Sequence, residues 1–498
     1  MKKPLVSLLT AVSLLAVFSF SPCAFADTAY KPSQEGNPIS CQVFCADPTA
    51  VEYNGRLYVY GTSDQQQCDE KGPNADNTYE KIRSIEVFST DDMVNWEYHG
   101  PIRVGEIAPW IVSSWAPSIV SRVEADGLTH FYLYFSNNGL GCGVITATDP
   151  LGPWSDPLGR PLLQYDTPGL ADCPNPFDPG AVIDDNGVGW LSFGGGRPRN
   201  GTDYMPGSAR IVRLGSDMLS FDSGFIAIPA PYFFEASELN MINGTWVYTY
   251  CSDWSSHADR WEYDTPVPGG CSMIWMKTAA PLDTESWEMG GECLKNPGES
   301  GFDYSNNHTH LHRYRGRWYI FYHTLSLKRA KGIQGGYRSI CVDEIQVDEA
   351  AVIIKATRGT KQGVIAPPTP VSPYVPHPGA QIASGTDIMW DVSDSHAPLA
   401  VSENARAWTC FRCADFSAGD WPEIAVFSAG IHGSGSVEVH LDSPTGEMIA
   451  RVSAENAAAA IPHRITGVRD LYFVFTEIDT AIISWEVSSA HVVDAFGR

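Results

Sequence analysis

Runs of alternating aromatic and aliphatic residues, each entered through a glycine turn, dominate the first two thirds of the chain. The run Trp246–Tyr250, for example, follows the pair Asn243-Gly244. Asn-Gly between two strand-like runs is a strong hairpin signal, because both turn residues tolerate positive φ angles. The pattern predicts a β-hairpin over Tyr232 to Ser252, with Glu235 near the start of its first strand.

A strand, a glycine turn and a second strand rich in Tyr, Trp and Phe recur five times. The turn glycines lie 57 to 72 residues apart, at Gly55, Gly127, Gly187, Gly244 and Gly316. A repeat longer than about 40 residues with several short strands in each unit is typical of a β-propeller blade. We therefore expect an all-β protein whose larger domain is a five-bladed β-propeller.

Four of the five units carry an ionisable residue eight or nine positions before the turn glycine, namely Asp47, Asp178, Glu235 and His308. An equivalent register means an equivalent place in each blade. If the first strand of each blade lines the central channel, these four side chains converge on one spot.

Three carboxylates around one channel point to acid–base chemistry at a sugar acetal. An inverting glycosidase needs one carboxylate to activate water and one carboxylic acid to protonate the leaving oxygen, roughly 6.5–9.5 Å apart. Glu235 follows Tyr-Phe-Phe, an apolar setting that raises a carboxyl pKa, so it suits the acid. Asp47 suits the base, and Asp178 suits a third residue that holds Glu235 and tunes its pKa. Glu238 stands only six positions before Gly244 and is expected to face elsewhere.

The N-terminus has the form of a secretory signal. Lys2 and Lys3 precede an apolar run from Leu5 to Phe20, and Ala24-Phe25-Ala26 offers a small-x-small cleavage site. No other apolar stretch reaches membrane-spanning length. We expect cleavage after Ala26 and a secreted product.

Acidic residues outnumber basic ones by 58 to 33, which gives a formal net charge of −25. Nucleic acid and anionic membrane surfaces both require positive charge, so neither is expected as a partner, whereas a neutral substrate fits. Without its signal the chain keeps 11 cysteines, an odd number that leaves at least one unpaired. Their spacing indicates no metal site. We also expect a monomer that needs no organic cofactor.

The chain changes character after the fifth unit. Pro367 to Pro378 is rich in proline and has the composition of a semi-rigid linker. Beyond it, short strands such as Val437–Leu441 and Asp470–Phe475 predict a β-sandwich (jelly-roll) domain. The predicted organisation is a signal peptide over residues 1–26, a catalytic propeller over 27–366, a linker over 367–378 and the sandwich over 379–498.

Several motifs resemble family 43 of the glycoside hydrolases, and the run Leu325 to Ser339 is similar to the arabinoxylan arabinofuranohydrolases within it. The motifs are Ala46-Asp47-Pro48, Trp115-Ala-Pro, Asp178-Pro, Phe234-Glu235-Ala-Ser and Asn306-Asn-His308. The resemblance implies inversion of configuration, with Asp47 as general base, Asp178 as pKa modulator and Glu235 as general acid. It also implies substrate contacts by Trp115, Phe234 and Arg338. A structural calcium is implied near His308, where Thr309 replaces the family's frequent second histidine.

The region from about Gln381 is similar to a family 6 carbohydrate-binding module, through Leu441–Gly446 and Ile465–Phe475. It lacks the module's usual acidic start, the aromatic stretch before Ile465 and an asparagine near Trp485. These losses fall where such modules usually contact sugar. We therefore expect a folded sandwich with weak or altered sugar binding, and Trp408 as its remaining aromatic platform.

The sequence thus predicts a secreted hydrolase that removes α-L-arabinofuranosyl side groups from arabinoxylan or a related plant cell-wall polysaccharide such as arabinan. A β-xylosidase and an arabinanase are alternatives that share the fold and the three carboxylates. A catalytically silent sugar-binding propeller is an alternative of a different class. A silent protein would have no reason to keep all three carboxylates, which favours the hydrolase.

Overall fold

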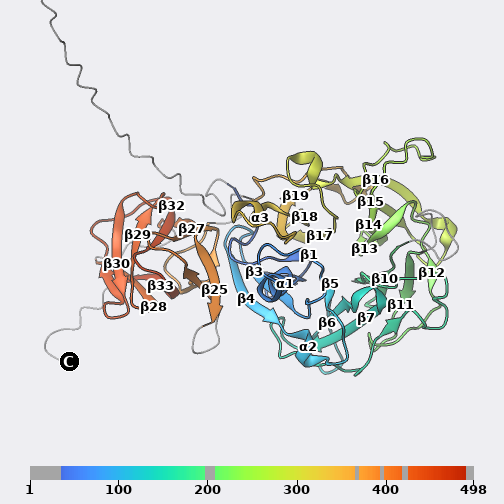
Figure 1. Ribbon diagram of the computed structural model, residues 1–498, viewed down its shortest axis with the longest axis horizontal. Helices are drawn as coiled ribbons and strands as arrows, with labels where there is room; N and C mark the ends of the chain where they lie inside the picture. Colours follow the sequence, from blue (N-terminus) through green and yellow to red (C-terminus); the bar gives the residue numbers. More distant parts are fainter. Residues whose placement is uncertain (1–34, 197–207, 365–369, 393–397, 418–423, 490–498) are drawn as a thin grey trace, which may run out of the picture.

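The structure is a computed structural model that describes residues 35–196, 208–364, 370–392, 398–417 and 424–489. A large ring of sheets lies beside a smaller body of orange and red strands, and the predicted all-β class is confirmed (Figure 1). The described helices are short: α1 (Asp64–Lys71), α2 (Val104–Ile107) and α3 (Ser326–Ala330), with 3₁₀ turns at Asn138–Leu140, Thr284–Ser286 and Pro297–Ser300. None of these helices is long and apolar enough to cross a membrane. The predicted signal peptide lies outside the described residues.

Five antiparallel sheets follow one another along the larger body, one for each predicted repeat. The first contains β1 (Ala46–Tyr53), β2 (Arg56–Thr62), β3 (Ile85–Thr90) and β4 (Trp96–Ile102). The second contains β5 (Trp115–Val123), β6 (Thr129–Ser136), β7 (Gly141–Ala147) and β8 (Leu163–Gln164). The third contains β9 (Gly180–Ile183), β10 (Gly189–Phe193), β11 (Arg210–Arg213) and β12 (Ile226–Ala227).

The fourth and fifth sheets continue this order. The fourth contains β13 (Phe233–Ile242), β14 (Thr245–Ser252), β15 (Met273–Thr278) and β16 (Glu288–Leu294). The fifth contains β17 (His310–Tyr314), β18 (Arg317–Thr324) and β19 (Ser339–Glu344), and a separate pair, β20 (Val347–Asp348) and β21 (Ile353–Ile354), follows it.

Glycine turns join the first two strands of each sheet. Gly55, Gly127, Gly187, Gly244 and Gly316 have φ angles between 71° and 81°. Glycine reaches this left-handed region without the steric penalty that a Cβ atom brings. The five predicted hairpins are therefore confirmed.

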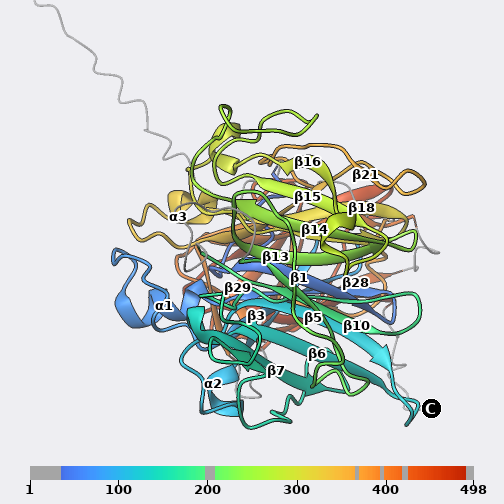
Figure 2. The same ribbon diagram turned by 90° about the vertical axis from the view of Figure 1, so that its right-hand side faces the viewer.

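The first strands of the five sheets lie next to one another around a central axis (Figure 1). β1 packs against β5, β5 against β9, β9 against β13, and β17 against β1. The remaining neighbours, β13 and β17, are joined by the Leu311 N–H, which donates to Glu238 Oε1 at 3.0 Å. Figure 2 shows α1, α2 and α3 at one end of the sheets. Because α1 follows the end of β2, which is antiparallel to β1, this is the end at which β1 begins.

The common register predicted for the three carboxylates is wrong by one residue. In each of the first four sheets, a residue near the start of the first strand donates its backbone N–H to a side chain of the neighbouring sheet. This donor residue has a φ between 40° and 62°. The four pairs are Asp47 with His323 Nδ1 (3.3 Å), Ala116 with Thr62 Oγ1 (2.7 Å), Asp178 with Ser136 Oγ (2.8 Å) and Ala236 with Asp178 Oδ2 (2.9 Å). Ala236, and not Glu235, is thus equivalent to Asp47. Asp47 and Ala236 both stand eight positions before their turn glycines, whereas Asp178 stands nine before its own, so a count that admits both spacings does not separate Glu235 from Ala236. Irregularities in strand pairing flank Glu235.

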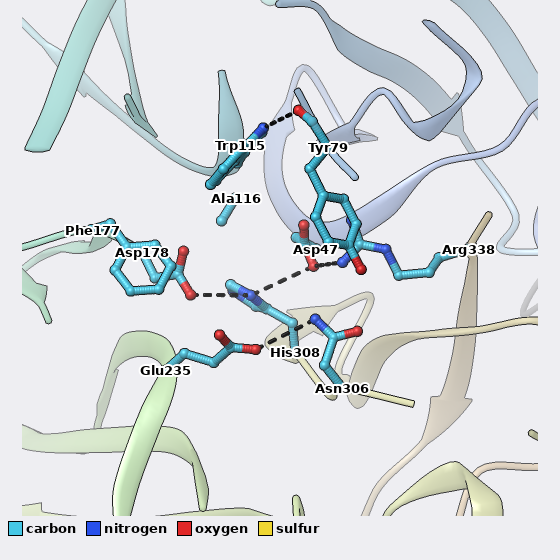
Figure 3. A pocket seen from close by; sticks show the side chains of 10 residues that line it. All are labelled: Asp47, Tyr79, Trp115, Ala116, Phe177, Asp178, Glu235, Asn306, His308 and Arg338. Atoms are coloured by element: carbon cyan, nitrogen blue, oxygen red, sulfur yellow. Dashed lines mark hydrogen bonds and ion pairs between the residues drawn. The ribbon is translucent and has the colours of Figure 1, made fainter. Parts of the chain in front are cut away.

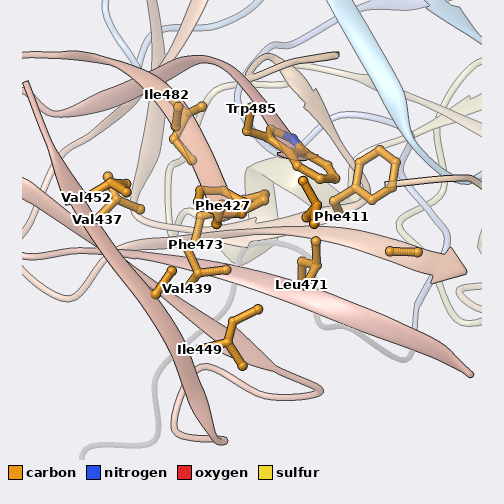
Figure 4. Close-up of a cluster of buried hydrophobic side chains, with 14 of the residues drawn as sticks. Phe411, Phe427, Val437, Val439, Ile449, Val452, Leu471, Phe473, Ile482 and Trp485 are labelled. Carbon is orange, nitrogen blue, oxygen red and sulfur yellow. The ribbon is translucent and has the colours of Figure 1, made fainter. Parts of the chain in front are cut away.

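Two facing sheets make up most of the C-terminal body, as predicted for a sandwich. One contains β24 (Ser384–Thr386), β27 (Trp408–Asp415), β32 (Val468–Phe475), β29 (Ser436–Leu441) and β30 (Met448–Ser453). The other contains β22 (His377–Pro378), β33 (Ala481–Ser489), β28 (Ala425–His432) and β31 (Ala458–Ala460). A hairpin of β25 (Ile388–Val392) and β26 (Pro398–Ser402) accompanies them. Phe411, Phe427, Phe473 and Trp485 pack between the sheets (Figure 4).

The prediction that Trp408 is an exposed platform for sugar is wrong. Its side chain is 5% exposed and packs against Tyr472, with 5.2 Å between ring centroids. Sugar stacking needs an accessible aromatic face, which this indole does not offer.

The two bodies are joined by paired strands. β23 (Gln381–Ile382) adds to the edge of the first sheet, where Ile382 pairs with Trp96 of β4. Trp390 of β25 packs edge-on against Tyr98, with ring centroids 5.8 Å apart. Within the predicted linker, Val371 pairs with Ala414, so this part of the proline-rich segment lies against the sandwich. The predicted domain boundaries stay predictions.

Candidate active site

A pocket opens where the first strands begin, on the central axis of the ring (Figure 3). Its cavity volume is about 110 Å³, below the roughly 300–1,000 Å³ of drug-sized ligand sites. This size suits a single sugar unit better than several. The lining residues are Asp47, Tyr79, Trp115, Ala116, Phe177, Asp178, Glu235, Asn306, His308 and Arg338.

Asp47 lies on β1 and is 5% exposed, and each of its two carboxylate oxygens accepts a hydrogen bond. Oδ1 accepts a hydrogen bond from Arg338 Nη1 at 2.9 Å, and Oδ2 accepts one from Thr62 Oγ1 at 2.7 Å. Burial opposes a charge here, but the Arg338 guanidinium holds the pKa of Asp47 well below its ordinary value. The carboxylate is therefore ionised over the whole neutral range, as a general base must be.

Glu235 is in the opposite state. Burial raises its pKa to about 7, and the nearby Asp47 charge acts in the same direction, while a hydrogen bond from Asn306 works against it. That bond runs from Asn306 Nδ2 to Glu235 Oε1 at 3.4 Å. A carboxyl that keeps its proton up to neutral pH can act as a general acid.

Asp178 is hydrogen-bonded to the backbone beside Glu235. Its Oδ2 accepts the N–H of Ala236, the residue after Glu235, at 2.9 Å, and its Oδ1 accepts from Ser136 Oγ at 3.2 Å. Burial and the neighbouring charges of Glu235 and Asp47 raise the pKa of Asp178 well above its ordinary value. Because the charges of these three carboxyls act on one another, the ionisation of each depends on the state of the others.

His308 stands between two of these carboxylates, its Nδ1 3.7 Å from Asp47 Oδ1 and 4.0 Å from Asp178 Oδ2. Burial lowers the pKa of His308 to about 4, so the imidazole is neutral at neutral pH. Polar side-chain atoms of its neighbours Asn307 and Thr309 are buried without a hydrogen-bond partner.

Calcium takes six to eight oxygen ligands, among which water molecules count. The described part of the chain holds no group of three or more His, Cys, Asp or Glu residues that could bind a metal. The calcium implied by the resemblance stays a prediction, and no chemical step below depends on it.

Two of the three expected substrate-binding residues, Trp115 and Arg338, line the pocket. Phe234 does not; it packs edge-on against Trp254, with ring centroids 6.1 Å apart. Glu238 also lies away from the pocket, as expected, because its Oε1 contacts His310 Nδ1 at 2.6 Å.

Sequence reasoning gave no site role to four lining residues, Tyr79, Ala116, Phe177 and Asn306. Phe177 and Asn306 each stand one or two positions before a predicted site residue, so the repeat itself could have drawn attention to them. Tyr79 lies outside any repeat, in the segment between β2 and β3, and no sequence signal marks it.

An ionised Asp47 and a protonated Glu235 beside one pocket are in the states that the base and the acid of a glycoside hydrolase require. Residues 36–351 match the family model described as glycosyl hydrolases family 43, and the chain belongs to this family.

Curated relatives extend the similarity over almost the whole chain. An arabinoxylan arabinofuranohydrolase of Bacillus subtilis is 33% identical over 510 residues, which cover 96% of this chain and 97% of that protein. An arabinoxylan arabinofuranohydrolase of Paenibacillus polymyxa is 31% identical over 513 residues, covering 95% of this chain and 77% of that protein. The crystal structure of a family 43 arabinoxylan arabinofuranohydrolase from Bacillus subtilis, in complex with cellotetraose, has a TM-score of 0.81 at 30% identity, covering 93% of this chain and 99% of that one.

Proposed function

We propose that the chain is an inverting α-L-arabinofuranosidase that removes arabinofuranosyl side groups from arabinoxylan. The observation that carries this proposal is one pocket that holds an ionised Asp47 and a protonated Glu235. The five sheets are taken as the five blades of a propeller, with the active site on its axis. The N-terminal signal expected over residues 1–26 makes the enzyme an exported one.

In this proposal Asp47 accepts a proton from water as that water attacks the anomeric carbon. Glu235 gives its proton to the glycosidic oxygen, so that the bond to the xylan backbone breaks and arabinose leaves with inverted configuration. Asp178 modulates the pKa of Glu235 and fixes the backbone beside it through the Ala236 N–H. The neutral His308 and the ring of Trp115 shape the pocket around the sugar.

Exposed aromatic rings beside the pocket support a polymeric substrate. Phe234 precedes Glu235 and contacts Trp254, whose ring centroid lies 6.1 Å from that of Tyr304. Trp254 is 47% exposed and Tyr304 50% exposed. Such rings offer flat apolar faces on which the sugars of a polysaccharide backbone can stack. Removal of a side group requires a pocket for one sugar and, beside it, a surface that binds the polysaccharide backbone, and this site offers both.

The names of the two full-length relatives favour arabinoxylan over arabinan or xylo-oligosaccharides. A β-xylosidase remains the nearest alternative, because the same acid and base would serve it. Membership of family 43 and the intact set of carboxyls favour a hydrolase over a silent binding protein. Sugar binding by the C-terminal module is a separate proposal, and without Trp408 as a platform it would be weak.

The test is the identity of the sugar released from wheat-type arabinoxylan by the mature protein, measured by anion-exchange chromatography. Arabinose without xylose is the expected product. Xylose alone would overturn the specificity and favour a β-xylosidase. No sugar from arabinoxylan, arabinan or xylo-oligosaccharides would overturn the catalytic proposal as a whole.

A further inference from the structure

Arg338, which contacts Asp47, is held from its other side by Asp64. This aspartate is the first residue of α1 and is completely buried. Its Oδ2 accepts from the Arg338 backbone N–H at 2.8 Å and from Nε at 3.0 Å, and its Oδ1 accepts from Nη2 at 2.9 Å. Asp64 thus binds the backbone N–H and two guanidinium nitrogens of Arg338, and the third guanidinium nitrogen, Nη1, donates to Asp47.

Asp64 also fixes the segment that forms the neighbouring wall of the pocket. Its Oδ2 accepts from Asn77 Nδ2 at 2.9 Å, and the Asn77 side chain accepts the N–H of Tyr79 at 3.3 Å. The Tyr79 ring lies under the guanidinium, 4.9 Å from Arg338 Cζ, beside Trp115 in Figure 3. The Trp115 indole in turn donates to the Tyr79 carbonyl at 3.0 Å.

The segments before Tyr79 and before Arg338 are bound to each other. The Gly335 N–H donates to the Pro73 carbonyl at 2.9 Å, and the Gln334 N–H donates to Asn74 Oδ1 at 3.0 Å. Asp64 lies at the junction of these two segments, on a helix that neither of them belongs to. One carboxylate therefore connects the base, the aromatic wall and the helix.

The orientation of the Arg338 guanidinium depends on its hydrogen bonds with Asp64. A carboxylate that binds two guanidinium nitrogens fixes the plane of the guanidinium as well as its position. The contact with Asp47 is a single hydrogen bond, which fixes a distance and leaves the plane free. Without Asp64 the long arginine side chain would have several orientations, and only some of them would reach Asp47.

We propose that Asp64 is a positioning residue for catalysis, which acts through Arg338 to keep Asp47 ionised and aimed at the attacking water. Asp64 is outside the pocket lining and so does not touch the sugar. The inference rests on the proposed role of Asp47 as general base. It names a residue that neither the repeat nor the family resemblance singled out.

The test is a double-mutant cycle of Asp64→Asn and Arg338→Gln, assayed with an aryl α-L-arabinofuranoside across pH. We expect Asp64→Asn to lower kcat 10- to 100-fold with little change in KM, and to move the acidic limb of kcat/KM to higher pH. Because Asp64 acts through Arg338, adding Asp64→Asn to the Arg338→Gln variant should cost less than twofold more. Losses that multiply, or an acidic limb that stays in place, would overturn the inference.

Two further variants keep the test decisive if Asp64→Asn folds poorly. Asp64→Glu retains a carboxylate and should recover part of the activity and of the acidic limb; failure to do so in a folded protein would count against the inference. Asp69→Asn makes the same chemical change at an exposed position of α1 and should leave activity unchanged. If the wild-type protein has no activity on the arabinoside, that result contradicts the proposed function and not the role of Asp64. The double-mutant cycle would then be run with an aryl β-xyloside.

Discussion

Asp47 and Arg338 form a buried ion pair, with 2.9 Å between Oδ1 and Nη1 and less than a tenth of either side chain exposed. A buried carboxylate without such a partner would be protonated near neutral pH, because burial disfavours the charge. The pair therefore makes Asp47 the ionised carboxyl of the pocket. Glu235 instead accepts a hydrogen bond from the neutral Asn306 amide, and burial raises its pKa to about 7.

Replacing Asp47 by Asn should abolish hydrolysis. The amide cannot take a proton from water, and acid–base residues contribute about 10² to 10⁴ in rate. We expect a fall of at least about 10³ in kcat/KM, with KM little changed. Asp126→Asn, the same change at an exposed turn, is the control and should leave kinetics intact. An Asp47→Asn variant with a tenth of wild-type activity would exclude Asp47 as the base.

Replacing Glu235 by Gln should affect substrates according to their leaving groups. Arabinoxylan needs a proton on the leaving oxygen, whereas an activated aryl arabinofuranoside leaves without one. The loss should be about 10² to 10⁴ on arabinoxylan and much smaller on the aryl substrate. Glu238→Gln is the matched control, because Glu238 binds the Leu311 N–H outside the pocket and should change both rates by the same factor. Equal losses on both substrates for Glu235→Gln would argue against its role as the acid.

The value of kcat/KM should decrease as the pH rises through about 7. Glu235 must be protonated to act, and its pKa is raised to about 7, so activity is lost as pH rises through that value. Asp47 must be ionised, and its depressed pKa places the acidic limb well below the ordinary pKa of an aspartate. A profile that rises toward pH 9 would contradict this assignment.

Removing the Asn306 amide should move the alkaline limb upward. Its hydrogen bond favours the ionised form of Glu235, so Asn306→Ala should raise the pKa of Glu235 and extend activity to higher pH. The comparison variant is Asn186→Ala, at an exposed turn of the third sheet, which should leave the limb in place. A downward shift in Asn306→Ala would mean that the amide acts in some other way.

The Trp254→Ala substitution should weaken activity on the polymer and leave activity on a small substrate unchanged. The indole is half exposed and lies outside the pocket lining, so its loss should raise KM for arabinoxylan several-fold and leave the aryl arabinofuranoside unchanged. Initial rates on both substrates provide the measurement. An equal effect on both would mean that Trp254 supports Glu235 through Phe234 instead of binding the backbone.

The sequence identified the site through the repeat, since Asp47, Asp178 and Glu235 each stand near the start of a hairpin whose turn glycine can be counted. The count was off by one at Glu235, because spacings of eight and nine were both admitted and the residue that matches Asp47 is Ala236, at eight. The repeat could not reach Tyr79 and Asp64, because they lie between hairpins and meet Arg338 only in the folded chain. Trp408 was misjudged because an aromatic on a strand has the same pattern whether its face meets the core or water.

Hydrolysis with inversion by Asp47 and Glu235 is the central claim, and the anomer of the first product tests it most directly. Proton NMR of the mature enzyme acting on an α-L-arabinofuranoside, recorded within the first minutes, distinguishes the two anomers of arabinose before they equilibrate. The account predicts that the β-anomer appears first and that the α-anomer follows at the rate of mutarotation. The α-anomer as first product would indicate retention, with a carboxylate acting as nucleophile, and would contradict the account.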